Sequence, residues 1–103
     1  MEVSEIYELL SKTMLPVAYQ MFPEDEIPEL PILIYTIPYS SNFSADGCVY
    51  SKGNHVQIDL YTGKKEPETE KKVEDILSGY YWEKTEEYLD EEQCYRIMYE
   101  MEV

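Results

Sequence analysis

The sequence is poor in basic residues. Its 103 residues include 8 Lys and Arg against 22 Asp and Glu, so the formal charge is 8 − 22 = −14. Proteins that bind nucleic acid without sequence preference do so through Lys and Arg, which displace counterions from the phosphates. Anionic membrane surfaces attract the same side chains. The composition therefore argues against direct nucleic-acid binding and against membrane association.

The residue types that carry catalysis and metal binding are also scarce. One His, two Cys and four Gly form no CxxC or HxxxH pair and no glycine-rich phosphate loop. The acidic triplets at 24–26 and 90–92 lack the spacing of a calcium loop. Asp46, Cys48 and His55 can be drawn as an orienter, a nucleophile and a base, but no motif supports that triad. We therefore expect no enzyme, no metal and no cofactor.

Long apolar runs and export signals are missing as well. The longest apolar run, residues 30–35, has the length of a strand and is far short of the ~20 residues of a membrane span. Residues 1–5 are acidic and lack the basic start of a signal peptide. Cys48 and Cys94 are then expected to be reduced thiols in a protein that is made and kept in the cytoplasm.

Hydrophobic periodicity predicts two helices and four strands. Apolar residues at spacings of three and four predict helices over 3–14 and 66–77, the second with Pro67 in its first turn. Alternating apolar residues predict four strands, at 32–39, 55–62, 80–88 and 94–103. Residues 17–19 suit a short extended segment, and the three prolines of 23–31 indicate a surface loop.

The order of these elements is helix, strand, strand, helix, strand, strand. It predicts a single α+β domain over 1–103, with two helices packed on one face of a mostly antiparallel or mixed four-stranded sheet. Eleven tyrosines are spread over the elements. Tyr61, Tyr88 and Tyr95 are the candidates for the uncovered face, where they either contact a protein partner or occupy ordinary half-buried strand positions.

Three segments, in this order and spacing, resemble a family of small tail-completion (tail-terminator) proteins of siphophages and prophages of Gram-positive bacteria. They are LPVAY at 15–19, SNFSADG at 41–47 followed by Val49-Tyr50, and DLYTGKKEPETE at 59–70. The last predicted strand, CYRIMYEME at 94–102, also resembles that family. The likeness spans nearly the whole chain. One departure is the GKK at 63–65, where an acidic residue after the threonine is more usual.

The resemblance implies an α+β fold and a structural role. Such proteins cap the head-proximal end of the tail tube and form the surface on which the head connector docks. The implied partners are further copies of the chain in a hexameric ring, the major tail tube protein and the head–tail connector. No catalytic residue or cofactor is implied. The implied location is the host cytoplasm during assembly and the head–tail junction of the virion afterwards.

A ring of six copies gives the lysines and the acidic loops a further meaning. Such a ring carries 6 × −14 = −84 charges, and a negative lumen would let DNA slide past without being held. Half of the basic residues cluster at Lys64, Lys65, Lys71 and Lys72. They pair either with acids of their own helix or with the acidic loops at 24–26 or 90–92 of a neighbouring subunit.

The segment 41–47 is a second candidate interface, through Phe43 and Asp46. Phe43 lies in a polar loop, so it is either anchored in its own core, which we favour, or offered to a partner. The rival functions are a small acidic inhibitor that mimics DNA and the neighbouring head-completion role. A small enzyme has no motif behind it.

Overall fold

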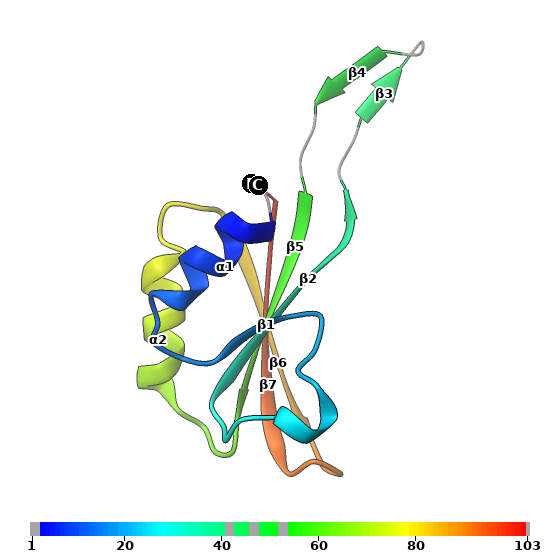
Figure 1. Cartoon of the computed structure of the whole chain (residues 1–103). Helices are drawn as coiled ribbons and strands as arrows, with labels where there is room; N and C mark the ends of the chain where they lie inside the picture. Colours follow the sequence, from blue (N-terminus) through cyan, green and yellow to red (C-terminus); the bar gives the residue numbers. More distant parts are fainter. Residues whose placement is uncertain (1–2, 41–42, 46–47, 52–53, 103) are drawn as a thin grey trace.

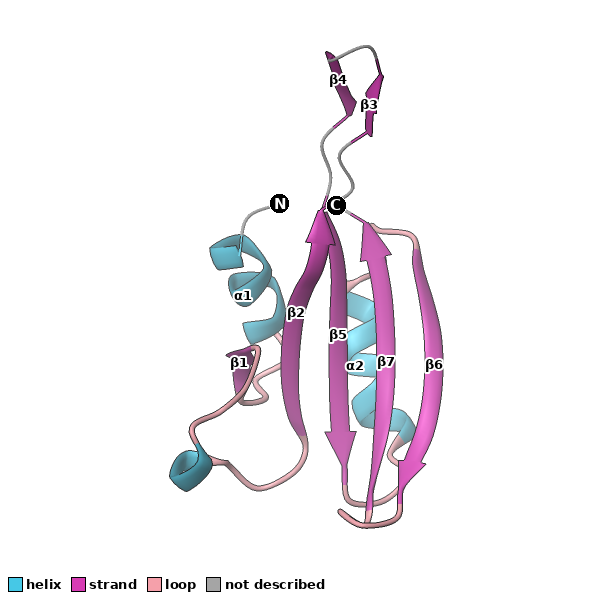
Figure 2. Cartoon of the chain, turned by 90° about the vertical axis from the view of Figure 1, so that its right-hand side faces the viewer, coloured by secondary structure: helices cyan, strands magenta, loops and turns pink. Residues whose placement is uncertain are grey.

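The centre of the fold is a mixed sheet of five strands in the order β1-β2-β5-β7-β6. This computed structural model describes residues 3–40, 43–45, 48–51 and 54–102, and between 38 and 54 it describes the backbone alone. The strands are β1 (Val17–Tyr19), β2 (Ile32–Ser40), β5 (Asn54–Thr62), β6 (Trp82–Leu89) and β7 (Cys94–Glu102). β1 runs parallel to β2, and all other pairs are antiparallel. Figure 2 shows the sheet face on.

Two helices, α1 (Val3–Ser11) and α2 (Pro67–Ile76), lie on one face of this sheet, which we call the helix face (Figure 1). Every second residue of β5 points to them, so that Val56, Ile58 and Leu60 are buried in the core. The helices contribute apolar stripes at helical spacing: Ile6 and Leu10 from α1, Val73 and Leu77 from the α2 side. The predicted α+β class is confirmed.

The predicted four-stranded sheet is wrong by one strand. Residues 17–19 are not merely extended but form β1, an edge strand in register with Leu33–Tyr35 of β2. The Leu33 N–H donates to the Pro16 carbonyl at 2.9 Å, and the Gln20 N–H donates to the Tyr35 carbonyl at 2.8 Å. Three residues are too short to show an alternating pattern, so the pairing decides the strand rather than its own sequence.

A second sheet of two strands lies in the chain between the last residue of β2 and the first residue of β5. It consists of β3 (Phe43–Ala45) and β4 (Cys48–Ser51), which pair antiparallel. Figure 1 shows this hairpin projecting away from the body of the domain. The side chain of Phe43 and the whole of Asp46 lie outside the described residues, so their predicted interface role stays a prediction.

The first helix ends three residues earlier than the sequence predicts. After Ser11 the backbone closes in a turn, and Met14 takes a positive φ of 66°. The Thr13 hydroxyl donates to the Leu10 carbonyl at 2.7 Å and accepts the Leu15 N–H at 3.2 Å. These bonds stop the helix. Met14, whose spacing from Ile6 and Leu10 puts it in the apolar stripe of the predicted helix at 3–14, is instead 90% exposed.

We call the face opposite the helices the open face. The loop between β1 and β2 covers part of it. This loop holds a short 3₁₀ helix, η1 (Glu24–Glu26), which Figure 1 shows on the opposite side of the sheet from α1 and α2. Neither α1 nor α2, the two α-helices in the part of the chain described, has the length and apolar character needed to cross a bilayer.

Candidate functional site

The predicted lysine cluster divides into paired and unpaired members. Lys65 forms ion pairs with Glu70, at 2.8 Å, and with Glu86. Lys71 lies 3.7 Å from Asp75, one helical turn further on. Lys64 and Lys72 are exposed, and no carboxylate among the described residues lies within 4.0 Å of their ammonium groups.

Glu70 is the buried centre of the paired group, a role the sequence does not suggest. Its side chain is 4% exposed and bridges Lys65 to Lys84, whose ammonium lies 2.7 Å away. Burial opposes ionisation of the Glu70 carboxyl, but the hydrogen bonds from the two lysines outweigh it, so its pKa falls below the ordinary value. The bridge joins α2 to β6, which makes this part of the cluster structural.

The same network continues into the core. Lys84 also lies 2.8 Å from Glu74, and the Tyr99 hydroxyl donates to Glu74 at 2.8 Å. Burial, reinforced by the Glu74 hydrogen bond, raises the pKa of Tyr99 far above its ordinary value. The phenol therefore stays neutral and acts as a hydrogen-bond donor.

The three candidate tyrosines do not share one face. Tyr61 lies on the open face, because its neighbours in β5, Leu60 and Thr62, are buried and point to the other face of the sheet. Tyr95 packs against the core beneath the helices, and Tyr88 faces it in the register of β6 and β7, with ring centroids 4.9 Å apart. Tyr88 and Tyr95 therefore lie on the helix face and not on the uncovered face, because β6 and β7 carry them there, while a role of these tyrosines in partner contacts stays a prediction.

A charged clamp crosses the open face. Arg96 of β7 donates to Asp59 of β5 and to Glu87 of β6, both at 3.1 Å, and Gln57 also donates to Asp59 at 3.2 Å. Asp59 is only 5% exposed. The sequence predicts the strands but not this partnership, which depends on the register between three of them.

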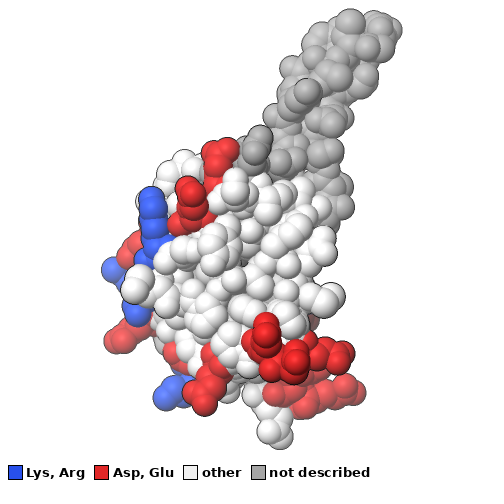
Figure 3. Space-filling view, in the orientation of Figure 1, with Lys and Arg blue, Asp and Glu red and all other residues white. Residues whose placement is uncertain are grey.

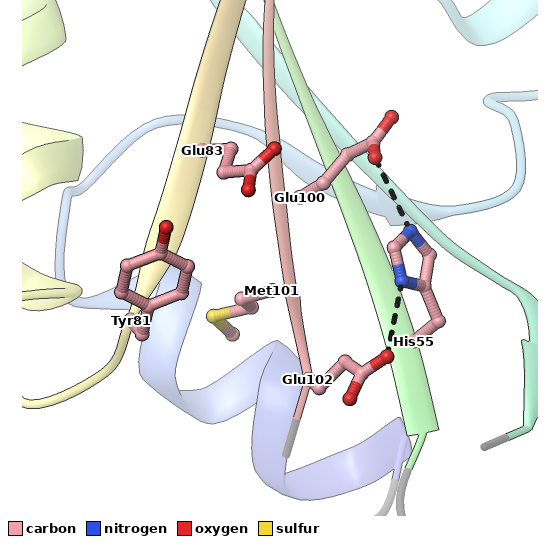
Figure 4. A pocket seen from close by; sticks show the side chains of 6 residues that line it. All are labelled: His55, Tyr81, Glu83, Glu100, Met101 and Glu102. Carbon is pink, nitrogen blue, oxygen red and sulfur yellow. Dashed lines mark ion pairs between the residues drawn. The ribbon is translucent and has the colours of Figure 1, made fainter.

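His55 lines a hollow of about 410 Å³ near the start of β5 (Figure 4). Its ring nitrogens lie 3.4 Å from Glu100 and 4.0 Å from Glu102, on the neighbouring strand. Tyr81, Glu83 and Met101 complete the lining. No three His, Cys, Asp or Glu side chains in the described part of the chain are placed to hold a metal. Asp46 and the Cys48 side chain lie outside it, so the triad stays untested.

A second hollow, of about 340 Å³, is apolar and lies on the open face under the β1–β2 loop. The sheet contributes Ile32, Ile34, Tyr61 and Cys94 to its floor. The loop contributes apolar side chains of its own: Met21, Phe22, Ile27 and Leu30. Burial, together with the negative charge of Glu92, raises the pKa of the free Cys94 thiol, which keeps it protonated.

Acidic residues lie on the segments that form the apolar hollow. Glu92 lines it, and the chain that forms its loop wall also carries Glu24, Asp25, Glu26 and Glu29. Figure 3 shows a red cluster at the lower right of the molecule, on the side of η1 and the β6–β7 turn, whereas the blue side chains all lie on the left. The three prolines of 23–31 predict a surface loop, and the apolar residues Ile27 and Leu30 within it are the sequence signal for the hollow.

We call the carboxylates at 24–26, 29 and 90–92 the acidic end. No Lys, Arg or His of the described residues lies within 4.0 Å of any of these seven groups. Seven like charges in one region repel each other and favour a cationic partner. The acidic end and the unpaired lysines Lys64 and Lys72 are thus two groups of opposite charge that form no ion pair among the described residues.

The fold defines the chain as an α+β domain with a mixed five-stranded sheet and two helices. Comparison of the chain with protein-family models, with curated proteins and with solved structures finds no match.

Proposed function

We propose that this chain is a structural tail-completion protein, which caps the head-proximal end of a phage tail tube and forms the docking surface for the head connector. The starting point is the resemblance of the ordered segments at 15–19, 41–47 and 59–70 to that family. The α+β architecture agrees with the fold that the resemblance implies. In this role the chain acts by assembly, with other copies and with tube and connector proteins, and carries out no reaction.

The observation that carries the proposal is the separation of the two unpaired charged surfaces. Lys64 lies in the loop between β5 and α2, which leads toward the helix face, whereas the β6–β7 turn with Asp90 and Glu91 belongs to the acidic end (Figures 1 and 3). Both loops lie at the same end of the sheet (Figure 2). Surfaces of opposite charge that lie on different faces of the domain, but at the same end of its sheet, suit a head-to-tail contact between copies. Such a contact can close into a ring.

The remaining charge suits a ring around DNA. Six copies carry −84 in total, and two lysines neutralise only part of each acidic end. At physiological salt, exposed charges act over about 8 Å, so a negative lumen repels the DNA backbone only at short range. Such a wall prevents counterion-release binding and leaves the DNA free to slide.

The test is a tube-growth assay with a major tail tube protein from the genome that encodes this chain. Added chain should shorten the tubes seen by negative-stain electron microscopy. The variant Lys64→Glu/Lys72→Glu should lose this effect, and adding Asp90→Lys/Glu91→Lys should restore it, because the swap returns the charge to −14 − 4 + 4 = −14 and the complementarity with it. Tubes of unchanged length with the unmodified chain would remove the proposal.

The acidic end also suits the rival function, an inhibitor that mimics DNA. That role requires a basic nuclease or DNA-binding protein as the partner, whereas tail completion requires tube and connector proteins. Affinity purification from infected or induced cells separates the two. Recovery of a basic nuclease that the chain inhibits would favour mimicry; recovery of a portal-side ring without tube protein would indicate head completion.

A further inference from the structure

We infer that Met14 of one copy inserts into the apolar hollow on the open face of the next copy, with Lys12 beside it facing the acidic end. This contact rests on the proposed function, since it describes how neighbouring subunits of the ring join. It names a protruding residue and its receiving site, neither of which follows from the resemblance.

Met14 has the properties of a protruding contact residue. At 90% exposed it is the most exposed large apolar side chain among the described residues. Its positive φ is uncommon for a residue other than glycine and projects it from the turn after α1. Its unbranched thioether adapts to irregular hollows, which is why methionine is frequent at binding surfaces.

The turn that presents Met14 is fixed before any partner binds. Thr13 is buried, and its hydroxyl joins the Leu10 carbonyl to the Leu15 N–H. The Met14 N–H donates to the Ser11 carbonyl at 3.0 Å. Because the backbone of this turn is already ordered, little backbone entropy is lost when Met14 binds, so more of the gain from burying its side chain remains as affinity.

The receiving hollow is apolar and only partly covered by its own loop. Ile27, at its wall, is 60% exposed, and Met21 and Leu30 are also exposed. Exposed apolar groups gathered around a hollow and rimmed by polar residues indicate a protein-binding site. Glu92 at the hollow and the carboxylates of the adjoining loop disfavour an anionic lipid surface as the occupant.

Charge selects a second copy of this chain as the occupant. Lys12 lies two residues before Met14 and, like Lys64 and Lys72, has no carboxylate within 4.0 Å among the described residues. The loop from α1 to β1 lies on the helix side of the sheet and the β1–β2 loop on the other (Figure 1). One copy therefore offers an apolar side chain and cations on one side, and an apolar hollow with carboxylates on the other.

The test is cross-linking between two single-cysteine variants. Met14→Cys and Ile27→Cys are made separately in a chain whose native thiols are removed by Cys48→Ser and Cys94→Ala, and folding is checked by circular dichroism. Oxidation of an equal mixture, alone and with tail tubes, should give a covalent dimer that contains one of each. Either variant by itself should give little dimer.

Three results would overturn the contact. They are no mixed dimer in either condition, equal dimer from Met14→Cys by itself, and self-association unchanged by Met14→Glu. In sedimentation experiments Met14→Glu should weaken association at least tenfold, whereas Tyr81→Glu, an equally drastic change at an exposed aromatic elsewhere, should leave it intact. If cross-linking fails while the tube-growth effect persists, the contact is wrong and tail completion stands. If tube length is unaffected while the mixed dimer forms, the contact stands and tail completion is wrong.

Discussion

The ion bridge at Glu70 yields a prediction that can be worked from its geometry. The change Glu70→Gln keeps the size of the side chain and removes the charge that holds Lys65 at 2.8 Å and Lys84 at 2.7 Å. Hydrogen bonds to a charged group contribute about 1.5–3 kcal/mol. Both lysines are partly exposed and regain water, which lowers the expected loss to about 1–2 kcal/mol of unfolding free energy.

For a domain of about 100 residues, a loss of this size lowers the Tm by roughly 4–16 °C. The assay is thermal unfolding at pH 7 followed by circular dichroism. The matched control is Glu68→Gln, the same chemical change on the same helix at an exposed residue for which the structure records no ion pair, and it should change stability by less than about 0.5 kcal/mol. Equal effects of the two substitutions would refute the reasoning.

The pH dependence of the Glu70 effect follows from the direction of its pKa shift. Because the folded-state pKa lies below the ordinary value of 4.5, the carboxylate stabilises the fold fully above that value. The contribution is lost as the pH falls through the folded-state pKa. The stability difference between the unmodified chain and Glu70→Gln should therefore be constant near neutral pH and shrink below pH 4.5. A difference that grows on acidification would contradict this sign.

Further predictions concern the clamp, the core phenol and the buried thiol. Arg96→Met should cost about 1–3 kcal/mol by chemical denaturation, because it leaves the buried Asp59 carboxylate without its cation; a smaller loss than for an exposed Lys72→Met change would contradict this. Tyr99→Phe should cost about 0.5–1.5 kcal/mol by removing the hydrogen bond to Glu74, and an unchanged midpoint would count against it. Cys94 should react with a disulfide reagent far more slowly in the folded chain than in denaturant, and equal rates would show that the thiol is accessible.

Long elements could be predicted from the sequence because their patterns are local. The stripe that includes Val73 and Leu77 and the alternation of Val56, Ile58 and Leu60 each cover at least two turns or several strand positions. Met14 fits the stripe of the first helix equally well, yet the side-chain bonds of Thr13 end that helix before it. A pattern of apolar residues does not record where capping bonds stop the helix.

The site depends more on features that the sequence does not encode locally. From the sequence Glu70 is one of several acids in a first helical turn, and only the tertiary structure shows that it is buried and bridges Lys65 to Lys84. The sequence suggests the uncovered face for Tyr88 and Tyr95, whereas the register of β6 and β7 places both on the helix face. The apolar hollow joins the loop of 21–30 to the floor of β2, β5 and β7, which no short segment reveals.

The most direct test of the account is to count copies of the chain on single tail tubes. Fluorescently labelled chain is mixed with preformed tubes, and photobleaching steps are counted for each bound spot. The account predicts one spot at one end of each tube, with six steps at full labelling. Binding along the tube wall, at both ends, or as single copies would contradict the role of a ring that closes the head-proximal end.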